Sequence, residues 1–166
     1  FINENDVVTI DEGSTGLELA KMLVSCFNNL TVITHSLDIF NVMIQKDGFE
    51  VILIGGRFLK GENSFCGYLA ENSFKSLHLG KVFITPSALS LKSGLCNTDE
   101  QTVPLQRIIA SRADSVFILA DSDKFEKSAL YTTLPLDTSY TYITDSDMSD
   151  ELIKLYGENG YRIVRE

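Results

Sequence analysis

The stretch Asp11-Glu12-Gly13-Ser14-Thr15-Gly16 decides the fold, because it joins a strand-like apolar run, Val7–Ile10, to an amphipathic helical pattern that starts near Leu17. A strand, a tight turn and a helix in this order leave backbone N–H groups unpaired at the helix N-terminus, where the helix dipole favours negative charge. The two glycines allow close approach to the backbone, and Ser14 and Thr15 add hydroxyl groups. A phosphate or a carboxylate suits such a turn. The alternative is that Ser14 or Thr15 only caps the helix.

The same order of strand and helix repeats along the chain. Seven mostly continuous apolar runs are typical of strands buried on both faces of a sheet: Val7–Ile10, Leu30–Thr34, Glu50–Ile54, Lys81–Thr85, Ser115–Ala120, Tyr140–Thr144 and Tyr161–Val164. Helical patterns lie between them, over residues 17–27, 37–44, 69–77, 103–113 and 149–157. The alternation predicts βαβ units and an α/β fold with a mostly parallel sheet. The longest stretch that we expect to be irregular is Pro86–Thr98.

Size and composition are typical of one cytoplasmic domain that spans residues 1–166. The 166 residues are 44% hydrophobic, which is enough for a core, and no apolar run reaches the length of a membrane span. A net charge of −9 with scattered basic residues argues against nucleic-acid binding by this segment. Three widely separated cysteines suit reduced thiols and give no zinc spacing, so we expect neither a metal nor a cofactor. The chain begins with Phe1 rather than Met, and we expect a fragment of a longer protein.

Small, hydroxylated or acidic residues follow nearly every predicted strand. In a parallel sheet these segments meet at one edge, where ligands bind. The alternative is that each turn only needs such residues for its own geometry. Lys124 follows the strand 115–120 at this edge and would offer a point charge to a phosphate. The candidate ligand-binding residues are Asp11, Gly13, Ser14, Thr15, His35, Ser36, Gly55, Gly56, Thr85, Asp121 and Lys124.

Ordered motifs run across nearly the whole chain: Asp11-x-Gly13-Ser14-Thr15, Leu30-Thr31-Val32-Ile33-Thr34-x-Ser36-Leu37, Val51-Ile52-Leu53-Ile54-Gly55-Gly56, Gly67-x-Leu69-Ala70-Glu71, Lys81-x-Phe83-Ile84, Gly94-Leu95 and Leu119-Ala120-Asp121-Ser122-x-Lys124-Phe125. Each motif alone is weak. Their combination, in this order and spacing, resembles the C-terminal sensor domain of DeoR-type bacterial transcriptional repressors.

The resemblance implies a Rossmann-like sheet with helices on both faces, similar to ribose-5-phosphate isomerase and glucosamine-6-phosphate deaminase. It also implies a winged helix-turn-helix domain before this one, which binds operator DNA, and self-association into a homo-oligomer. The implied effector is a phosphorylated sugar that relieves repression of sugar-metabolism genes. The residues carried over from the motifs are Asp11, Gly13, Ser14 and Thr15 for the phosphate, with Ser36, Gly55, Gly56, Asp121 and Lys124 around it.

Several positions depart from the family pattern on the sugar-facing side. His35 stands where Asn is usual, and Thr85-Pro86-Ser87-Ala88 replaces a glycine-containing turn. Thr102 and Gln106 stand where a Glu and a Lys are common. Glu126 adds a carboxylate that would repel a phosphate if it pointed inward. These departures leave the identity of the effector open.

Two other functions compete with a sensor. An isomerase or deaminase needs a placed carboxylate base, yet Thr85–Thr98 holds no Asp or Glu, and we expect Asp99 and Glu100 to start a helix. His35 is the remaining acid–base candidate, so we predict that the chain is not an enzyme. A ligand-silent oligomerisation domain is the other alternative, and the retained Gly13–Thr15 loop and Lys124 argue against it.

Overall fold

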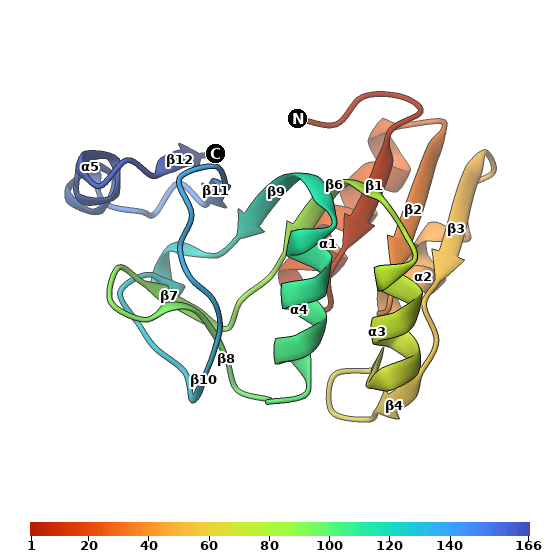
Figure 1. The fold of residues 1–166 in the computed structure, drawn as a ribbon. Helices are drawn as coiled ribbons and strands as arrows, with labels where there is room; N and C mark the ends of the chain where they lie inside the picture. Colours follow the sequence, from red (N-terminus) through yellow and green to blue (C-terminus); the bar gives the residue numbers. More distant parts are fainter.

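A computed structural model describes all residues from Phe1 to Glu166. A seven-stranded sheet forms its centre, and every pairing in this sheet is parallel (Figure 1). In spatial order its strands are β12 (Arg162–Arg165), β11 (Thr141–Thr144), β9 (Ala113–Leu119), β6 (Leu79–Ile84), β1 (Val7–Ile10), β2 (Leu30–Thr34) and β3 (Phe49–Leu53). These are the seven strands that the apolar runs predict, shifted by no more than two residues at either end.

The order of the strands reverses next to β1. The chain builds β1, β2 and β3 toward one edge, returns to place β6 on the other side of β1, and continues through β9, β11 and β12 to the far edge. After β1 the chain therefore turns toward one edge of the sheet, and after the neighbouring strand β6 it turns toward the other edge. In open parallel sheets, this switch point is where a ligand crevice forms.

Helices cover both faces of the sheet, as the α/β prediction requires. They are α1 (Ser14–Cys26), α2 (Leu37–Met43), α3 (Tyr68–Lys75), α4 (Thr102–Ser111) and α5 (Asp150–Glu158). One hydrophobic cluster holds buried side chains of α1 and α2, including Leu23 and Ile39, against Val8 and Val32. A second cluster holds Phe74 of α3 and side chains of α4 and α5. Figure 1 shows α3 and α4 in front of the sheet and α1 and α2 behind it.

Two small antiparallel sheets were absent from the sequence expectation. Strands β4 (Arg57–Leu59) and β5 (Ser64–Cys66) form a hairpin, while β7 (Ala88–Ser90), β8 (Gly94–Asn97) and β10 (Tyr131–Leu134) form a three-stranded sheet. The expectation that 86–98 is irregular is therefore wrong. Strands of three or four residues are too short to leave a periodic pattern, and burial of Leu89 and Leu95 holds them in place. A one-turn 3-10 helix, η1 (Ser122–Lys124), follows β9.

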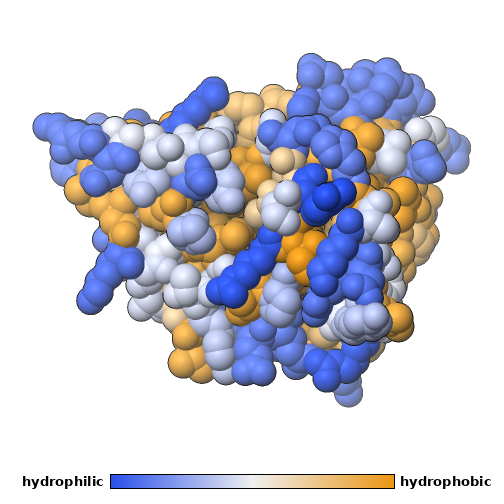
Figure 2. All heavy atoms as spheres, in the orientation of Figure 1, coloured by the Kyte–Doolittle hydropathy of each residue, from blue (hydrophilic) through white to orange (hydrophobic).

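On the face seen in Figure 2, hydrophilic side chains lie between the exposed apolar ones. None of the helices combines the length and the apolar character that crossing a bilayer would require.

Gly94 begins β8 in a left-handed conformation, with φ of 73°. A Cβ there would lie 2.4 Å from the carbonyl oxygen of Leu134 and 3.1 Å from Cα of Pro135. We expect Gly94→Ala to lower the free energy of unfolding by about 1–3 kcal/mol, since the side chain adds strain and a backbone clash. Urea unfolding measures this. Gly55→Ala is the control, because a Cβ at Gly55 meets nothing within 4 Å; equal midpoints for the two variants would contradict the argument.

Candidate functional site

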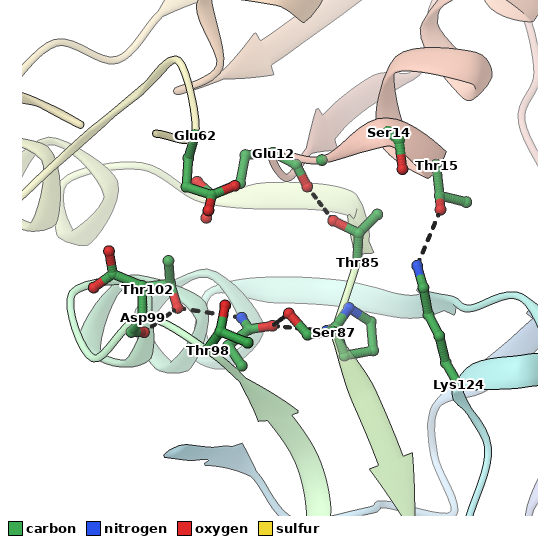
Figure 3. Close-up of a pocket in the computed structure, with 13 residues that line it drawn as sticks. Glu12, Ser14, Thr15, Glu62, Thr85, Ser87, Thr98, Asp99, Thr102 and Lys124 are labelled. Atoms are coloured by element: carbon green, nitrogen blue, oxygen red, sulfur yellow. Dashed lines mark hydrogen bonds between the residues drawn. The ribbon is translucent and has the colours of Figure 1, made fainter. Parts of the chain in front are cut away.

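A polar cavity opens above the carboxyl ends of β1 and β6. Its volume is about 330 Å³. The residues that line it, drawn in Figure 3, are Glu12, Gly13, Ser14, Thr15, Glu62, Thr85, Pro86, Ser87, Asn97, Thr98, Asp99, Thr102 and Lys124. Five of the predicted ligand-binding residues are among them, namely Gly13, Ser14, Thr15, Thr85 and Lys124. Pro86 is the one apolar side chain in its wall and the others are polar or charged, so the cavity suits a hydrophilic ligand.

The N-terminus of α1 opens onto this cavity. Gly13 is the N-cap, with φ of 113°, and no side chain caps the helix. The alternative that Ser14 or Thr15 is the cap is therefore wrong, because both are helical residues. The first bond of the helix runs from the Leu17 N–H to the Gly13 carbonyl, at 3.0 Å. The N–H groups of Ser14 and Thr15 come before this bond and so have no partner within the helix. Such N–H groups bind anions at helix N-termini.

Lys124 of η1 brings a positive charge to this helix N-terminus. Its Nζ donates to Thr15 Oγ1 at 3.4 Å and lies 3.7 Å from Asp121 Oδ2 (Figure 3). The side chain is 22% exposed. A cation beside the positive end of a helix dipole is electrostatically unfavourable unless an anion lies between or beside them. Asp121 meets part of this requirement, and the N–H groups at the uncapped N-terminus of α1 remain available as donors to a bound anion.

A hydrogen-bond network around Asn97 forms the opposite wall. Asn97 Oδ1 accepts from the amide and the hydroxyl of Ser87 at 2.8 and 3.0 Å, and its Nδ2 donates to Thr102 Oγ1 at 3.2 Å. Thr102 Oγ1 donates in turn to the Asp99 carbonyl at 2.9 Å. The network joins the loop after β6, strand β8 and the start of α4. Sequence reasoning missed Asn97 and Ser87, because the small sheet that places them gave no periodic pattern.

Asp11 lies beneath the cavity, not on its wall. Its side chain is 1% exposed and its two oxygens have three partners. Oδ1 lies 2.9 Å from His35 Nε2, while Oδ2 accepts from Gln106 Nε2 at 2.6 Å and from the Thr85 amide at 3.3 Å. The two departures His35 and Gln106 thus converge on one buried carboxylate.

His35 faces an oxygen at each ring nitrogen. Nε2 faces Asp11, and Nδ1 lies 3.0 Å from the Phe65 carbonyl and 3.1 Å from Glu12 Oε2. Because a neutral imidazole has only one N–H, this geometry fits the doubly protonated form. Burial alone would lower the pKa of His35, but the charges of Glu12 and Asp11 outweigh it and raise the pKa.

Glu12 belongs both to the cavity wall and to this buried group. Burial raises the pKa of its carboxyl group to about 7, and the charges of Asp11 and Glu62 act in the same direction. The attraction of His35 opposes this rise. We refer to Asp11, Glu12 and His35 as the buried triad.

The triad offers three potential metal ligands, since one ligand atom from each residue falls within 4.8 Å of the others. The carboxylates, however, flank opposite nitrogens of the imidazole. An ion bound in the ring plane at one nitrogen would face only one carboxylate. The geometry therefore fits a carboxylate–imidazolium–carboxylate arrangement better than a metal centre.

Four other predicted residues lie outside the cavity wall. Ser36 caps α2, where its hydroxyl accepts from the Ile39 amide. Gly55 and Gly56 follow β3, and a Cβ at Gly56 would lie 2.6 Å from the Cys66 carbonyl oxygen, so this glycine permits close backbone packing. Asp121 is the N-cap residue of η1 and lies beside Lys124.

Glu126 does not point into the cavity. Its Oε1 accepts from the Tyr156 hydroxyl at 2.7 Å and from the Leu91 amide at 3.2 Å. These partners belong to α5 and to the loop after β7. The repulsion of a phosphate that an inward carboxylate would cause is therefore absent.

The raised pKa values of Glu12 and His35 predict that the free energy of unfolding falls as pH rises through neutrality. The folded chain holds the Glu12 proton up to about pH 7, whereas the ordinary value is 4.5, so folding binds a proton between these values and loses stability as pH rises. The raised pKa of His35 acts in the same sense, because its stabilisation is complete below its ordinary value and is lost as pH rises through the folded one.

Glu12→Gln should therefore flatten the dependence of stability on pH. At pH 8 we expect it to be more stable than wild type by on the order of 2 kcal/mol, with a much smaller difference at pH 5. Thermal and urea unfolding between pH 5 and pH 8 measure this. Glu151→Gln, at an exposed position in α5, should keep the wild-type slope. A steep slope retained by Glu12→Gln would contradict the assignment.

Solved structures share this fold. Ribose 5 phosphate isomerase A from Neisseria gonorrhoeae has a TM-score of 0.54 and 15% identity, over 78% of this chain and 49% of that chain. The beta subunit of eIF2B from Chaetomium thermophilum has a TM-score of 0.50 and 16% identity, over 78% and 37% of the two chains. The Rossmann-like, isomerase-like fold expected from the resemblance is thus confirmed.

Curated relatives are named as transcriptional regulators. The HTH-type transcriptional regulator IolR of Bacillus subtilis is 30% identical over 159 residues, which cover 96% of this chain and 63% of that protein. The lactose phosphotransferase system repressor of Lactococcus lactis is 27% identical, over 95% and 62%. This chain thus spans less than two thirds of these relatives' length. The family model of the DeoR C terminal sensor domain matches residues 1–146. The chain belongs to the DeoR family of transcriptional regulators, as a C-terminal sensor domain.

Proposed function

We propose that this domain senses a phosphorylated sugar in the cytoplasm. The observation that carries the proposal is the meeting of Lys124 with the uncapped N-terminus of α1 at one cavity. The phosphate would accept from the Gly13–Thr15 segment and from the Lys124 ammonium group. Thr85 stands beside Gly13, where its Oγ1 lies 3.1 Å from the position of a Cβ, so glycine keeps this approach open.

The rest of the cavity would hold the sugar. Ser87, Asn97 and Thr102 offer hydroxyl and amide groups, and Glu62 and Asp99 offer carboxylate oxygens as acceptors for sugar hydroxyls. The buried residues Asp11 and His35 would act from beneath, by holding Thr85 and Glu12 in place. Among the other residues carried over from the motifs, Ser36, Gly55, Gly56 and Asp121 would shape the surrounding loops.

The response would pass to DNA through other parts of the protein and through self-association. A ligand shifts an equilibrium only when it binds one arrangement more tightly than another. We propose that the sugar phosphate binds preferentially to one arrangement of a homo-oligomer, and that a DNA-binding domain outside this chain reads the change at an operator. The names of the relatives, which include a repressor of a lactose phosphotransferase system, support genes of sugar metabolism as the target.

A sugar-phosphate isomerase is the second candidate, favoured by the fold of ribose 5 phosphate isomerase A. Proton transfer next to a carbonyl needs a free base within reach of the substrate. The Asp11 oxygens and the His35 nitrogens are engaged with protein partners, so the candidate bases are the carboxyl groups of the cavity wall, Glu12, Glu62 and Asp99. A coupled assay with ribose 5-phosphate tests this alternative, and turnover that disappears on mutation of a cavity residue would establish it.

A phosphorylated ligand should raise the unfolding temperature of the domain, and its unphosphorylated counterpart should not. At a hundredfold excess over Kd the stabilisation is about 2.7 kcal/mol. The measurement is thermal unfolding against a panel of sugar phosphates, matched free sugars and inorganic phosphate. No shift with any panel member would favour a ligand-silent oligomerisation domain.

Lys124→Ala should remove most of this stabilisation while the ligand-free unfolding temperature stays within a degree or two. Removing a charge-assisted hydrogen bond to a phosphate costs on the order of 1.5–3 kcal/mol, or a tenfold or greater loss of affinity. Lys127→Ala is the matched control, because Lys127 is exposed, pairs with Asp123 and does not line the cavity. An unchanged ligand response in Lys124→Ala would refute the role of this lysine.

A further inference from the structure

Glu12 connects the cavity to the buried triad. It lines the cavity, and its Oε2 lies 3.1 Å from His35 Nδ1. Its side chain is only 8% exposed, so the carboxyl group is largely removed from water. A charge that enters the cavity therefore acts on a group that already belongs to a buried ion network.

Charged groups from several elements surround this carboxyl group. In Figure 3 it lies on the same side of the cavity as Glu62, whereas Lys124 and Thr15 lie on the other side. The titratable or charged residues that face it or the cavity are Asp11 of the turn after β1, His35 of the turn after β2, Glu62 of the turn between β4 and β5, Asp99 before α4, and Lys124 of η1.

The charges of this set do not favour an anion when Glu12 is ionised. With His35 protonated, the triad then has a net charge of −1, and Glu62 and Asp99 add two negative charges against the one positive charge of Lys124, which Asp121 partly offsets at 3.7 Å. Protonation of Glu12 makes the triad neutral. It also gives Glu12 an O–H that donates a hydrogen bond where the carboxylate could only accept one. A nearby anion favours this neutral form, since like charges raise the pKa of a carboxyl group.

We propose that an anion binds in this cavity together with one proton, which Glu12 takes up, so that the affinity for the anion falls as pH rises through the neutral range. This inference rests on the proposed phosphate site. It makes the domain respond to pH as well as to its ligand. Linkage to a single proton limits the change in Kd to tenfold per pH unit.

Inorganic sulfate is the probe that tests the inference, because it does not titrate between pH 6 and pH 8 and any proton must come to the protein. Chemical shifts of the Ser14 and Thr15 amides during a sulfate titration give Kd. For the wild type we expect Kd to rise by up to about tenfold from pH 6 to pH 8. In Glu12→Gln, whose amide imitates the neutral acid, Kd should be the same at both pH values and close to the wild-type value at pH 6.

Glu62→Gln is the matched control. It removes a negative charge from the same wall but leaves Glu12 and His35 in contact, so sulfate should bind more tightly at both pH values with the pH dependence retained. Calorimetry of the wild type in two buffers of different ionisation enthalpy gives a second readout. It should detect uptake of roughly half a proton per sulfate at pH 7.

Two results would overturn proton coupling and leave the phosphate site intact. One is a wild-type Kd that is equal at pH 6 and pH 8. The other is a pH dependence that persists in Glu12→Gln, which would assign it to another group such as His35, whose pKa the charge of Glu12 no longer raises in that variant. A complete absence of amide shifts with sulfate and with phosphate at pH 6 would instead contradict the proposed phosphate site itself, and this inference with it.

Discussion

The site depends on the burial of one carboxylate. Asp11 follows the central strand β1, and its two oxygens bind partners from the turns after β2 and β6 and from α4, namely His35, Thr85 and Gln106. An ionised carboxylate away from water is stable only when its lone pairs are matched by donors and its charge by a cation. Asp11 therefore fixes how the loops above three elements meet, and the cavity is the space that remains above them.

Two positions that depart from the family pattern meet at this carboxylate. The resemblance to the family predicts an asparagine at position 35 and a lysine at position 106, whereas this chain has a histidine and a glutamine there. Both side chains contact Asp11. In this chain Gln106 of α4 supplies an amide and His35, in the turn after β2, supplies the cation. His35 also lies next to Glu12, and this contact completes the buried triad.

The sequence predicts the main sheet well because its strands are buried on both faces and appear as continuous apolar runs. Gly13 and Lys124 were also predictable, since the strand–turn–helix order and the common edge of parallel strands place them. Asn97 and Ser87 were not, because strands of three or four residues leave no period, and only three-dimensional packing brings β8 next to the loop after β6. The inward position of His35 likewise depends on a partner 24 residues away.

The contacts of Asp11 and His35 also separate this site from an isomerase site on a similar sheet. A catalytic base needs a lone pair that faces the substrate, and those of Asp11 and His35 are directed at protein partners. Glu12 is the member of the triad that reaches the cavity, and burial raises the pKa of its carboxyl group to about 7, so the neutral form is present at neutral pH alongside the ionised one. A neutral carboxyl group donates a hydrogen bond to a ligand rather than removing a proton from it. In the proposed site, the ligand and pH would thus act on the same side chain, Glu12.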